Sequence, residues 1–242
     1  TFNSLSDGTY SDCTITVTNS SANSVTLSIS SFVIDTTAPT VTQETAVTTP
    51  TNDTTPNYTF STNEAGTITY GGSCSSSTTS AISGNNPITL NSLSDGTYSD
   101  CTITVTDSLG HASSALSVST FVVDTTAPSV DNFTLSDYHL KAGETATVTL
   151  VFSEVVASFE AADITADTGT LGTMTSSNNI TWTGTFTPTA DEEDAGNKLS
   201  LATSYTDTAG NAGTAATTLN YEVDTLAPSV ISFTLSPTAL KA

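Results

Sequence analysis

The chain has 242 residues, of which 36% are apolar, and its 24 acidic residues face three lysines and no arginine, for a formal net charge of −21 at pH 7. So acidic a surface repels a phosphate backbone, which excludes nucleic-acid binding. No apolar run approaches the length that spans a bilayer, so we expect no membrane insertion in this segment.

One short motif occurs three times along the chain. Residues 123–130 read VDTTAPSV, and near-copies stand at 34–41 and 223–230. Successive copies start 89 and 100 residues apart, which is the size of one β-sandwich domain. We therefore expect each copy to be the joint between two consecutive repeats.

Longer stretches repeat as well. Residues 2–18 return at 90–106 with a single change, Phe2 to Leu90, and 124–142 resembles 224–242. The chain is therefore expected to belong to a tandem array. The expected domains are the C-terminal half of a truncated repeat at 1–38, complete repeats at 39–127 and 128–227, and the first strand of a further repeat at 228–242.

Within residues 1–38, apolar residues alternate with threonine and serine, as in a strand with one wet face. The alternation places Cys13, Ile15 and Val17 on one side. Such a half sandwich exposes an apolar surface and needs complementing strands to be stable. Its three expected strands are 2–5, 13–17 and 25–34.

In the first complete repeat, turn residues separate short strands about every 8–12 positions, which is the spacing of an immunoglobulin-like sandwich. The segment 95–98 (Asp-Gly-Thr-Tyr) is expected to be a turn. The expected strand positions are Tyr58/Phe60, Ile68/Tyr70, Ile88/Leu90, Cys101/Ile103/Val105 and a last strand ending at Val123.

The second complete repeat shows the same alternation in a different sequence. Trp182 is expected to anchor its core, because tryptophan buries a large apolar area. Helix signals are absent, so the predicted fold is all-β: tandem immunoglobulin-like β-sandwich domains joined end to end by short Asp-Thr-x-Ala-Pro linkers. The expected strand positions are Phe133/Leu135, Val148/Leu150/Phe152, Ile180/Trp182, Phe186, Leu199/Leu201 and Leu219/Tyr221/Val223.

The chain has three cysteines. Cys74 and Cys101 lie in the first complete repeat, and Cys13 takes the Cys101 position in the truncated one. No Cys-x-x-Cys pair or nearby histidine favours a metal site. We predict a Cys74–Cys101 disulfide and hence an oxidising, extracellular compartment; three unpaired buried thiols are the alternative.

Several motifs combine in this chain: the joint, the Asp-Gly-x-Tyr segment, a Thr-Asp-x-x-Gly loop, and in the second repeat Leu140–Glu144, Val151–Glu154, Phe186–Pro188 and Thr206–Asn211. Together they resemble the bacterial immunoglobulin-like tandem repeats of large secreted (RTX-type) adhesins and repetitive surface proteins. The resemblance implies a stalk that projects a binding domain from the cell surface, with neighbouring repeats as partners and calcium at the joints. His111 departs from the pattern, where asparagine is usual.

The sandwich topology brings the end of one repeat close to two loops of the next. Carboxylates with so few cations nearby repel one another, whereas Ca²⁺ takes about 6–8 oxygen ligands. The sequence therefore predicts Ca²⁺ at the joints. The predicted ligands are Asp35, Glu64 and Asp107 at the first joint, Asp124, Glu154 and Asp207 at the second, and Asp224 at the third. Alternatively, Asp35, Asp124 and Asp224 only cap strands, and Asp107 and Asp207 only form turns before glycine.

Three functions are compatible with these patterns. No phosphate loop, His-x-x-x-His pair or nucleophile elbow occurs, so we predict neither enzymatic activity nor a catalytic residue. The leading hypothesis is a structural extender, or stalk, of a large extracellular bacterial adhesin. One alternative is a self-assembling subunit of a surface layer, sheath or extracellular filament, and a glycan-binding module ranks last.

Overall fold

The computed structural model describes residues 3–190 and 193–234, and the chain divides into two compact units. One comprises residues 1–49 and 53–123, and the other residues 50–52 and 124–242. Both consist of short β-strands, so the predicted all-β sandwich class is confirmed. The one helix in the described ranges is a 3-10 turn, Ala161–Asp163, and no helix there is long and apolar enough to cross a membrane.

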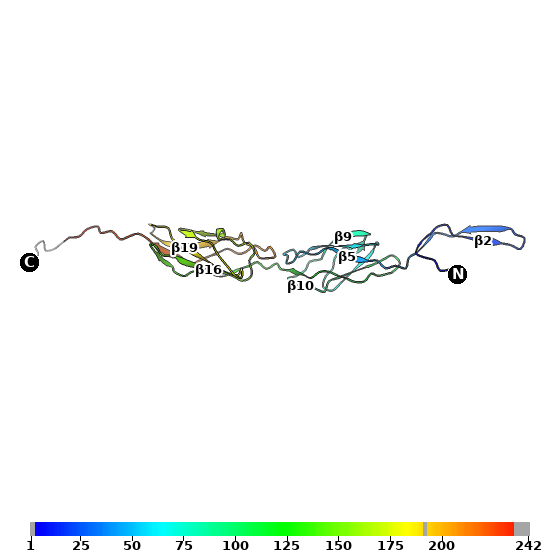
Figure 1. Ribbon diagram of the computed structural model, residues 1–242, viewed down its shortest axis with the longest axis horizontal. Coiled ribbons are helices and arrows are strands. Elements are labelled where there is room, and N and C mark those ends of the chain that lie inside the picture. The colour runs from blue at the N-terminus through cyan, green and yellow to red at the C-terminus, as the bar shows by residue number, and fades with distance from the viewer. Residues whose placement is uncertain (1–2, 191–192, 235–242) are drawn as a thin grey trace, which may run out of the picture. The chain divides into compact units, whose positions relative to one another are not determined.

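In the first unit, residues 41–123 form a two-layer sandwich, coloured cyan to green in Figure 1. One layer has the strand order β5-β6-β9 and the other β12-β11-β7-β8, and every pair is antiparallel. The bounds are β5 (Val41–Thr45), β6 (Asn57–Thr62), β7 (Gly66–Gly71), β8 (Ser80–Ala81), β9 (Gly84–Thr89), β11 (Thr102–Thr106) and β12 (Leu116–Ser117).

The core of this sandwich follows the period-two alternation of its strands. Tyr58 and Phe60 of β6 and Ile103 and Val105 of β11 are at most 1% exposed, so both layers bury the predicted apolar face. The predicted disulfide between Cys74 and Cys101 is present, with the two Cα atoms 5.2 Å apart.

The segment 95–98, expected as a turn, instead contributes a strand. Residues Gly96–Tyr98 (β10) pair antiparallel with β13 (Phe121–Val123). The Tyr98 ring stacks on Phe121 with centroids 5.2 Å apart, and its hydroxyl donates to the Ser94 carbonyl at 2.8 Å. This contact between distant parts of the chain outweighs the local turn composition.

The N-terminal residues form two separate two-stranded sheets. In one, β1 (Gly8–Tyr10) pairs with β4 (Phe32–Ile34); in the other, β2 (Thr14–Thr18) pairs with β3 (Ser24–Ser28). The strand expected over 25–34 is therefore divided between β3 and β4. The strand expected at 2–5 is not formed at residues 3–5, and its first residue lies outside the described part of the chain.

The second unit is also a sandwich, coloured green to orange in Figure 1. Its sheets have the orders β14-β16-β19-β18, β17-β21-β22 and β15-β23-β20, and β15 runs parallel to β23. The bounds are β14 (Val130–Leu135), β15 (His139–Lys141), β16 (Ala146–Phe152), β17 (Ile164–Ala166), β18 (Thr170–Leu171), β19 (Thr181–Thr187), β20 (Glu193–Asn197), β21 (Leu199–Leu201), β22 (Ala216–Thr217) and β23 (Tyr221–Asp224).

Aromatic rings fill the centre of this second core. Phe152 lies against Tyr205 with ring centroids 4.8 Å apart, and Phe186 meets the Tyr221 ring edge-to-face. Trp182, expected to anchor the core, is half-buried and packs against it, with its ring edge-to-face to Phe159. The further strand expected at 228–242 is not formed at residues 228–234, and residues 235–242 lie outside the described part.

The disulfide provides a first test of the fold. Replacing both Cys74 and Cys101 by alanine is expected to lower the free energy of unfolding of the first unit by about 3 kcal/mol, because the bridge closes a 27-residue loop. Hydrogen exchange should then quicken in peptides from residues 41–123. The chain's single tryptophan, Trp182, reports the second unit, and its urea midpoint should stay unchanged. Unchanged protection in the first unit would contradict this account.

Candidate metal centre

Two groups of side chains among the described residues bring potential ligand atoms within 4.8 Å of one another. The first unit holds Asp35, Asp107 and His111, and the second unit holds Asp124, Glu154 and Asp207. Each group therefore lies within a single unit. The second group unites the three residues that the sequence predicted for the second joint.

Asp207 lies in the loop after Tyr205 and is only 2% exposed. Its Oδ1 accepts backbone N–H groups of Ala209, Gly210 and Asn211 at 2.7–2.9 Å, and its Oδ2 accepts the Asn211 side-chain amide at 2.8 Å. The expected turn before Gly210 is thus present. A carboxylate offers about four lone pairs, so Oδ2 retains acceptor capacity for a cation.

Asn211 was not among the predicted site residues, yet it connects two parts of the group. Besides bonding Asp207, its side-chain amide donates to the backbone carbonyl of Asp124 at 2.8 Å. The Asp124 carboxylate accepts the backbone N–H of Thr126 at 3.0 Å. The signal in the sequence was the asparagine that ends the Thr206–Asn211 motif.

Glu154 follows β16 and is half-buried. Burial raises the pKa of its carboxyl group, and the charges of Asp124 and Asp207 raise this pKa further. No ion pair within the described part of the chain involves any of the three carboxylates. Their oxygen atoms are the donors that a hard divalent cation prefers.

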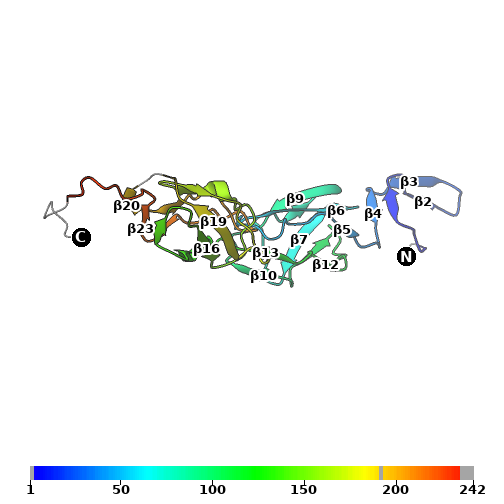
Figure 2. The same ribbon diagram turned by 60° about the vertical axis from the view of Figure 1, so that its left-hand side comes forward.

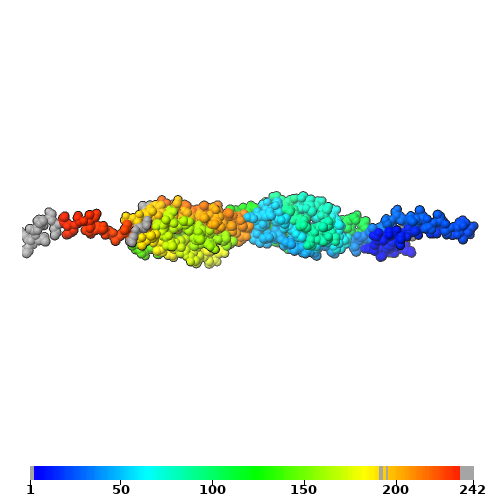
Figure 3. Space-filling view, turned by 90° about the horizontal axis from the view of Figure 1, so that it is seen from above, coloured from blue at the N-terminus to red at the C-terminus, as the bar shows by residue number. Residues whose placement is uncertain are grey.

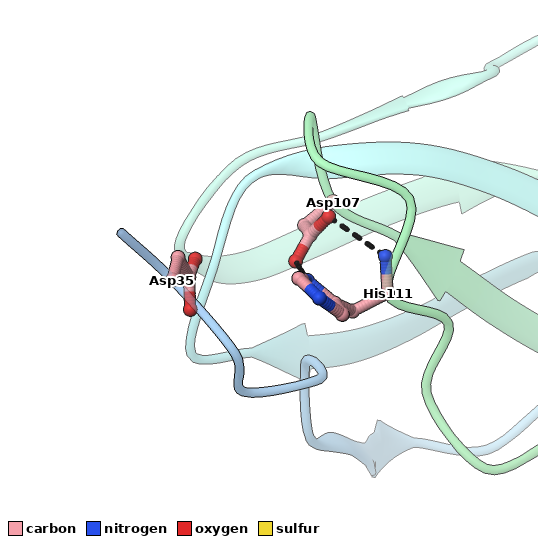
Figure 4. A group of neighbouring side chains, drawn as sticks. All are labelled: Asp35, Asp107 and His111. Carbon is pink, nitrogen blue, oxygen red and sulfur yellow. Dashed lines mark hydrogen bonds and ion pairs between the residues drawn. The ribbon is translucent and has the colours of Figure 1, made fainter. Parts of the chain in front are cut away.

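The first group has a different composition (Figure 4). Asp107 Oδ1 accepts the backbone N–H groups of Leu109 and His111 at 2.8 and 2.9 Å, and His111 Nδ1 lies 2.8 Å from Asp107 Oδ2. Asp35 Oδ1 accepts the N–H and hydroxyl of Thr37 at 3.1 and 2.9 Å. His111 therefore takes the place that Asn211 has in the second unit.

Within the first group, Asp107 and His111 shift each other's pKa. The hydrogen bond to Asp107 raises the pKa of His111, the charges of Asp107, Asp35 and Asp7 add to this, and burial opposes it. Burial pushes the pKa of Asp107 upward, but hydrogen bonds from the backbone and ring of His111, together with those from the backbone of Leu109 and Gly110, outweigh it and leave that pKa lowered. A protonated His111 thus supplies the positive charge that the second group lacks.

Glu64 was predicted beside Asp35 and Asp107, but the structure groups His111 with them instead. The Asn63 side chain donates to the Glu64 carboxylate at 3.1 Å. In the second unit, Ser153 precedes Glu154 in the position that Asn63 has before Glu64. Its hydroxyl accepts the backbone N–H of Ser129 at 3.0 Å and does not bond the Glu154 carboxylate.

Asp224 ends β23, opposite Glu193 of β20. It belongs to no group of three potential ligands among the described residues. A site at the third joint stays a prediction.

One comparison with known proteins matches the part of the chain that holds the second group. Residues 124–223, less than half of the chain, match the family described as bacterial Ig-like domain. That range contains Asp124, Glu154 and Asp207. No curated protein matches the chain.

Several solved structures resemble the chain weakly. One is invasin, a bacterial integrin-binding protein (14% identity, TM-score 0.28). This match covers 76% of this chain and 39% of that one. A second is the Bacteroides ovatus protein SGBP-B of a mixed-linkage glucan utilization locus, bound to a heptasaccharide (16% identity, TM-score 0.23). This match covers 93% of this chain and 55% of that one. A third is the titin domain pair Z1Z2 in complex with telethonin (11% identity, TM-score 0.27). This match covers 81% of this chain and 100% of that one.

The histidine in the first group predicts a pH dependence. Because the folded state raises the pKa of His111 above its unfolded value of about 6.5, the stability it contributes is complete below that pH and is lost as pH rises through the folded value. Hydrogen exchange in peptides around residues 102–123 should therefore be slower at pH 6 than at pH 8 after correction for intrinsic rates. His111→Asn, which copies Asn211, should flatten this difference. An equal pH effect in that variant would contradict the assignment.

Proposed function

We propose that this chain is a structural extender segment of an extracellular bacterial surface protein of the adhesin type, and that Ca²⁺ bound by Asp124, Glu154 and Asp207 stiffens the linker that begins at Asp124. The observation that carries the proposal is the convergence of three carboxylates within 4.8 Å with no ion-pair partner in the described part of the chain. The match of residues 124–223 to bacterial Ig-like domains supports it.

Calcium would relieve a repulsion that is built into this group. Carboxylates this close together repel one another, and after burial, which is the larger cause, the charges of Asp124 and Asp207 raise the pKa of Glu154 further. An ion would take oxygen atoms from all three side chains and complete its shell with water or backbone carbonyls. The residues present fit a hard cation that is held at a modest, extracellular affinity.

Ion binding would affect the linker directly, because one of the three ligand residues, Asp124, is the first residue of that linker. Asp124 directly follows Val123, the last residue of β13, while Glu154 and Asp207 belong to loops of the second unit. An ion shared by the three residues would fix the direction in which the chain leaves β13, and Pro128 restricts the linker further. Without the ion, mutual repulsion would make the same linker a hinge, which a stalk cannot use.

Calcium binding should stabilise the second unit measurably. For a dissociation constant of about 10⁻⁴–10⁻³ M, 10 mM Ca²⁺ adds about 1.4–2.7 kcal/mol relative to chelator, seen as a higher urea midpoint of Trp182 fluorescence. Asp124→Asn keeps an acceptor for the Thr126 N–H while removing the charge, so it should abolish the calcium effect. A calcium effect that persists in this variant would mean that Asp124 only forms a turn.

The Glu154→Gln variant distinguishes carboxylate repulsion from calcium binding, because the expected change in the free energy of unfolding has opposite signs in chelator and in Ca²⁺. The folded state raises the pKa of Glu154, so its contribution to stability is complete below about pH 4.3 and is lost as pH rises through the folded value. In chelator at pH 7, the glutamine variant should therefore be more stable than the parent chain, and in 10 mM Ca²⁺ less stable. The same change in both conditions would refute a shared ion.

A further inference from the structure

The two groups of potential ligands differ in the kind of donor atom that they offer. The second group has carboxylate oxygens alone, whereas the first adds an imidazole nitrogen of His111. Carboxylate and carbonyl oxygens suit Ca²⁺ and Mg²⁺, while imidazole suits Zn²⁺ and other transition metals. Histidine at 111, where the second unit has Asn211, therefore changes the class of cation that the group fits.

The loop that carries His111 has the same backbone hydrogen bonds as its counterpart. The N–H of Asp107 donates to the His111 carbonyl at 3.0 Å, and the N–H of Asp207 donates to the Asn211 carbonyl at 3.1 Å. In each loop the backbone N–H of the later residue also donates to the aspartate Oδ1 at 2.9 Å. The Asn211 amide can only donate from its nitrogen, whereas a neutral imidazole presents a lone pair that can bind a metal.

The three ligand residues come from two segments of the first unit. Asp35 directly follows β4, which is labelled in Figure 2, and Asp107 and His111 lie in the loop after β11. In Figure 3 the blue N-terminal part adjoins green atoms of the first sandwich, and Figure 4 shows the three side chains at this junction. An ion held here would connect the two segments.

The spacing of the ligand atoms is compatible with one small ion. All three lie within 4.8 Å of one another, and His111 Nδ1 is 2.8 Å from Asp107 Oδ2. Bonds of about 2.0–2.2 Å to Zn²⁺ place tetrahedral ligands about 3.3 Å apart, so small side-chain rotations suffice. Both hydrogen bonds that Asp35 accepts from Thr37 use Oδ1, and within the described residues Oδ2 accepts none.

Charge and burial also favour a divalent ion in the first group. A neutral imidazole and two carboxylates together carry two negative charges, which one Zn²⁺ balances. The side chain of Asp107 is 5% exposed and that of His111 34% exposed, so the protein excludes part of the water that would screen the attraction.

We propose that Asp35, Asp107 and His111 form a Zn²⁺ site, separate from the calcium group of the second unit. His111 Nδ1 and one carboxylate oxygen from each aspartate are the protein ligands, and water takes the fourth tetrahedral position. Binding releases to solvent the proton that His111 and Asp107 share in their hydrogen bond. The ion holds the segment that begins at Asp35 on the loop of residues 107–111, so the first joint responds to a different cation from the second.

The test is calorimetric titration of ZnCl₂ into the full chain in 10 mM CaCl₂, because excess calcium competes for sites made of oxygen alone. The chain carries Cys13→Ser, which removes the free thiol as an alternative zinc ligand. One ion per chain is expected. His111→Asn and Asp35→Asn should each weaken binding at least about tenfold, a loss that even a group supporting a metal ligand can cause. Glu64→Gln, a matched loss of one negative charge in the same unit, should leave the affinity nearly unchanged.

The ring nitrogen signals of the two histidines provide a readout specific to the site. Zinc should shift the NMR signals of the His111 ring and leave those of His139, which lies in the second unit, in place. This separates a built site from zinc that collects on an acidic surface.

Three results would overturn the proposal. An unchanged affinity in His111→Asn would mean that carboxylates alone bind the ion. Equal weakening by Glu64→Gln and Asp35→Asn would show general charge attraction, and equal shifts of both histidine rings would show adventitious binding. None of these results bears on the calcium proposal, whose readout is Trp182 in the second unit.

Discussion

Repulsion among carboxylates is the constraint on which the proposed function depends. A chain with 24 acidic residues and three lysines cannot pair most of its charges internally, and Asp124, Glu154 and Asp207 concentrate three of them within 4.8 Å. Burial strengthens the effect, because Asp207 is 2% exposed and Glu154 is half-buried. Burial raises the pKa of Glu154, and the charges of Asp124 and Asp207 raise it further. In the proposed function a bound cation would remove this cost, and its binding would then add to the stability of the fold.

The two units resolve the same problem with different chemistry. In the second unit, Asn211 is neutral, so its amide orients Asp207 and the Asp124 carbonyl but cancels no charge. In the first unit, His111 occupies the same place after Asp107, and its hydrogen bond to Asp107 raises its pKa, so a proton on this ring would place a positive charge within the group. We therefore expect protons to compete with metal in the first group and calcium to act alone in the second.

Much of the fold could be predicted from the sequence, because period-two alternation locates strands wherever one face is buried. It placed Tyr58 and Phe60, or Ile103 and Val105, correctly in the core. It could not locate β10, since Gly96–Tyr98 pairs with the distant strand Phe121–Val123, and the local sequence does not reveal this pairing.

The candidate site was predictable in part. Topology alone brought Asp124, Glu154 and Asp207 together, because loops at the same end of a sandwich must converge. The same reasoning named Glu64 in place of His111. There the Glu64 carboxylate accepts a hydrogen bond from the Asn63 side chain, and no spacing rule reveals such a bond. Asn211 was missed for a similar reason, since its role lies in two hydrogen bonds and not in charge.

The most direct measurement is a crystal structure of the chain grown in 10 mM CaCl₂, with anomalous difference density calculated from long-wavelength data. We expect a peak with oxygen atoms of Asp124, Glu154 and Asp207 all at about 2.3–2.6 Å from it, the range of Ca²⁺–oxygen bonds. Well-ordered side chains around a water molecule without anomalous signal would contradict the account, and these three residues would then only cap a strand and form turns.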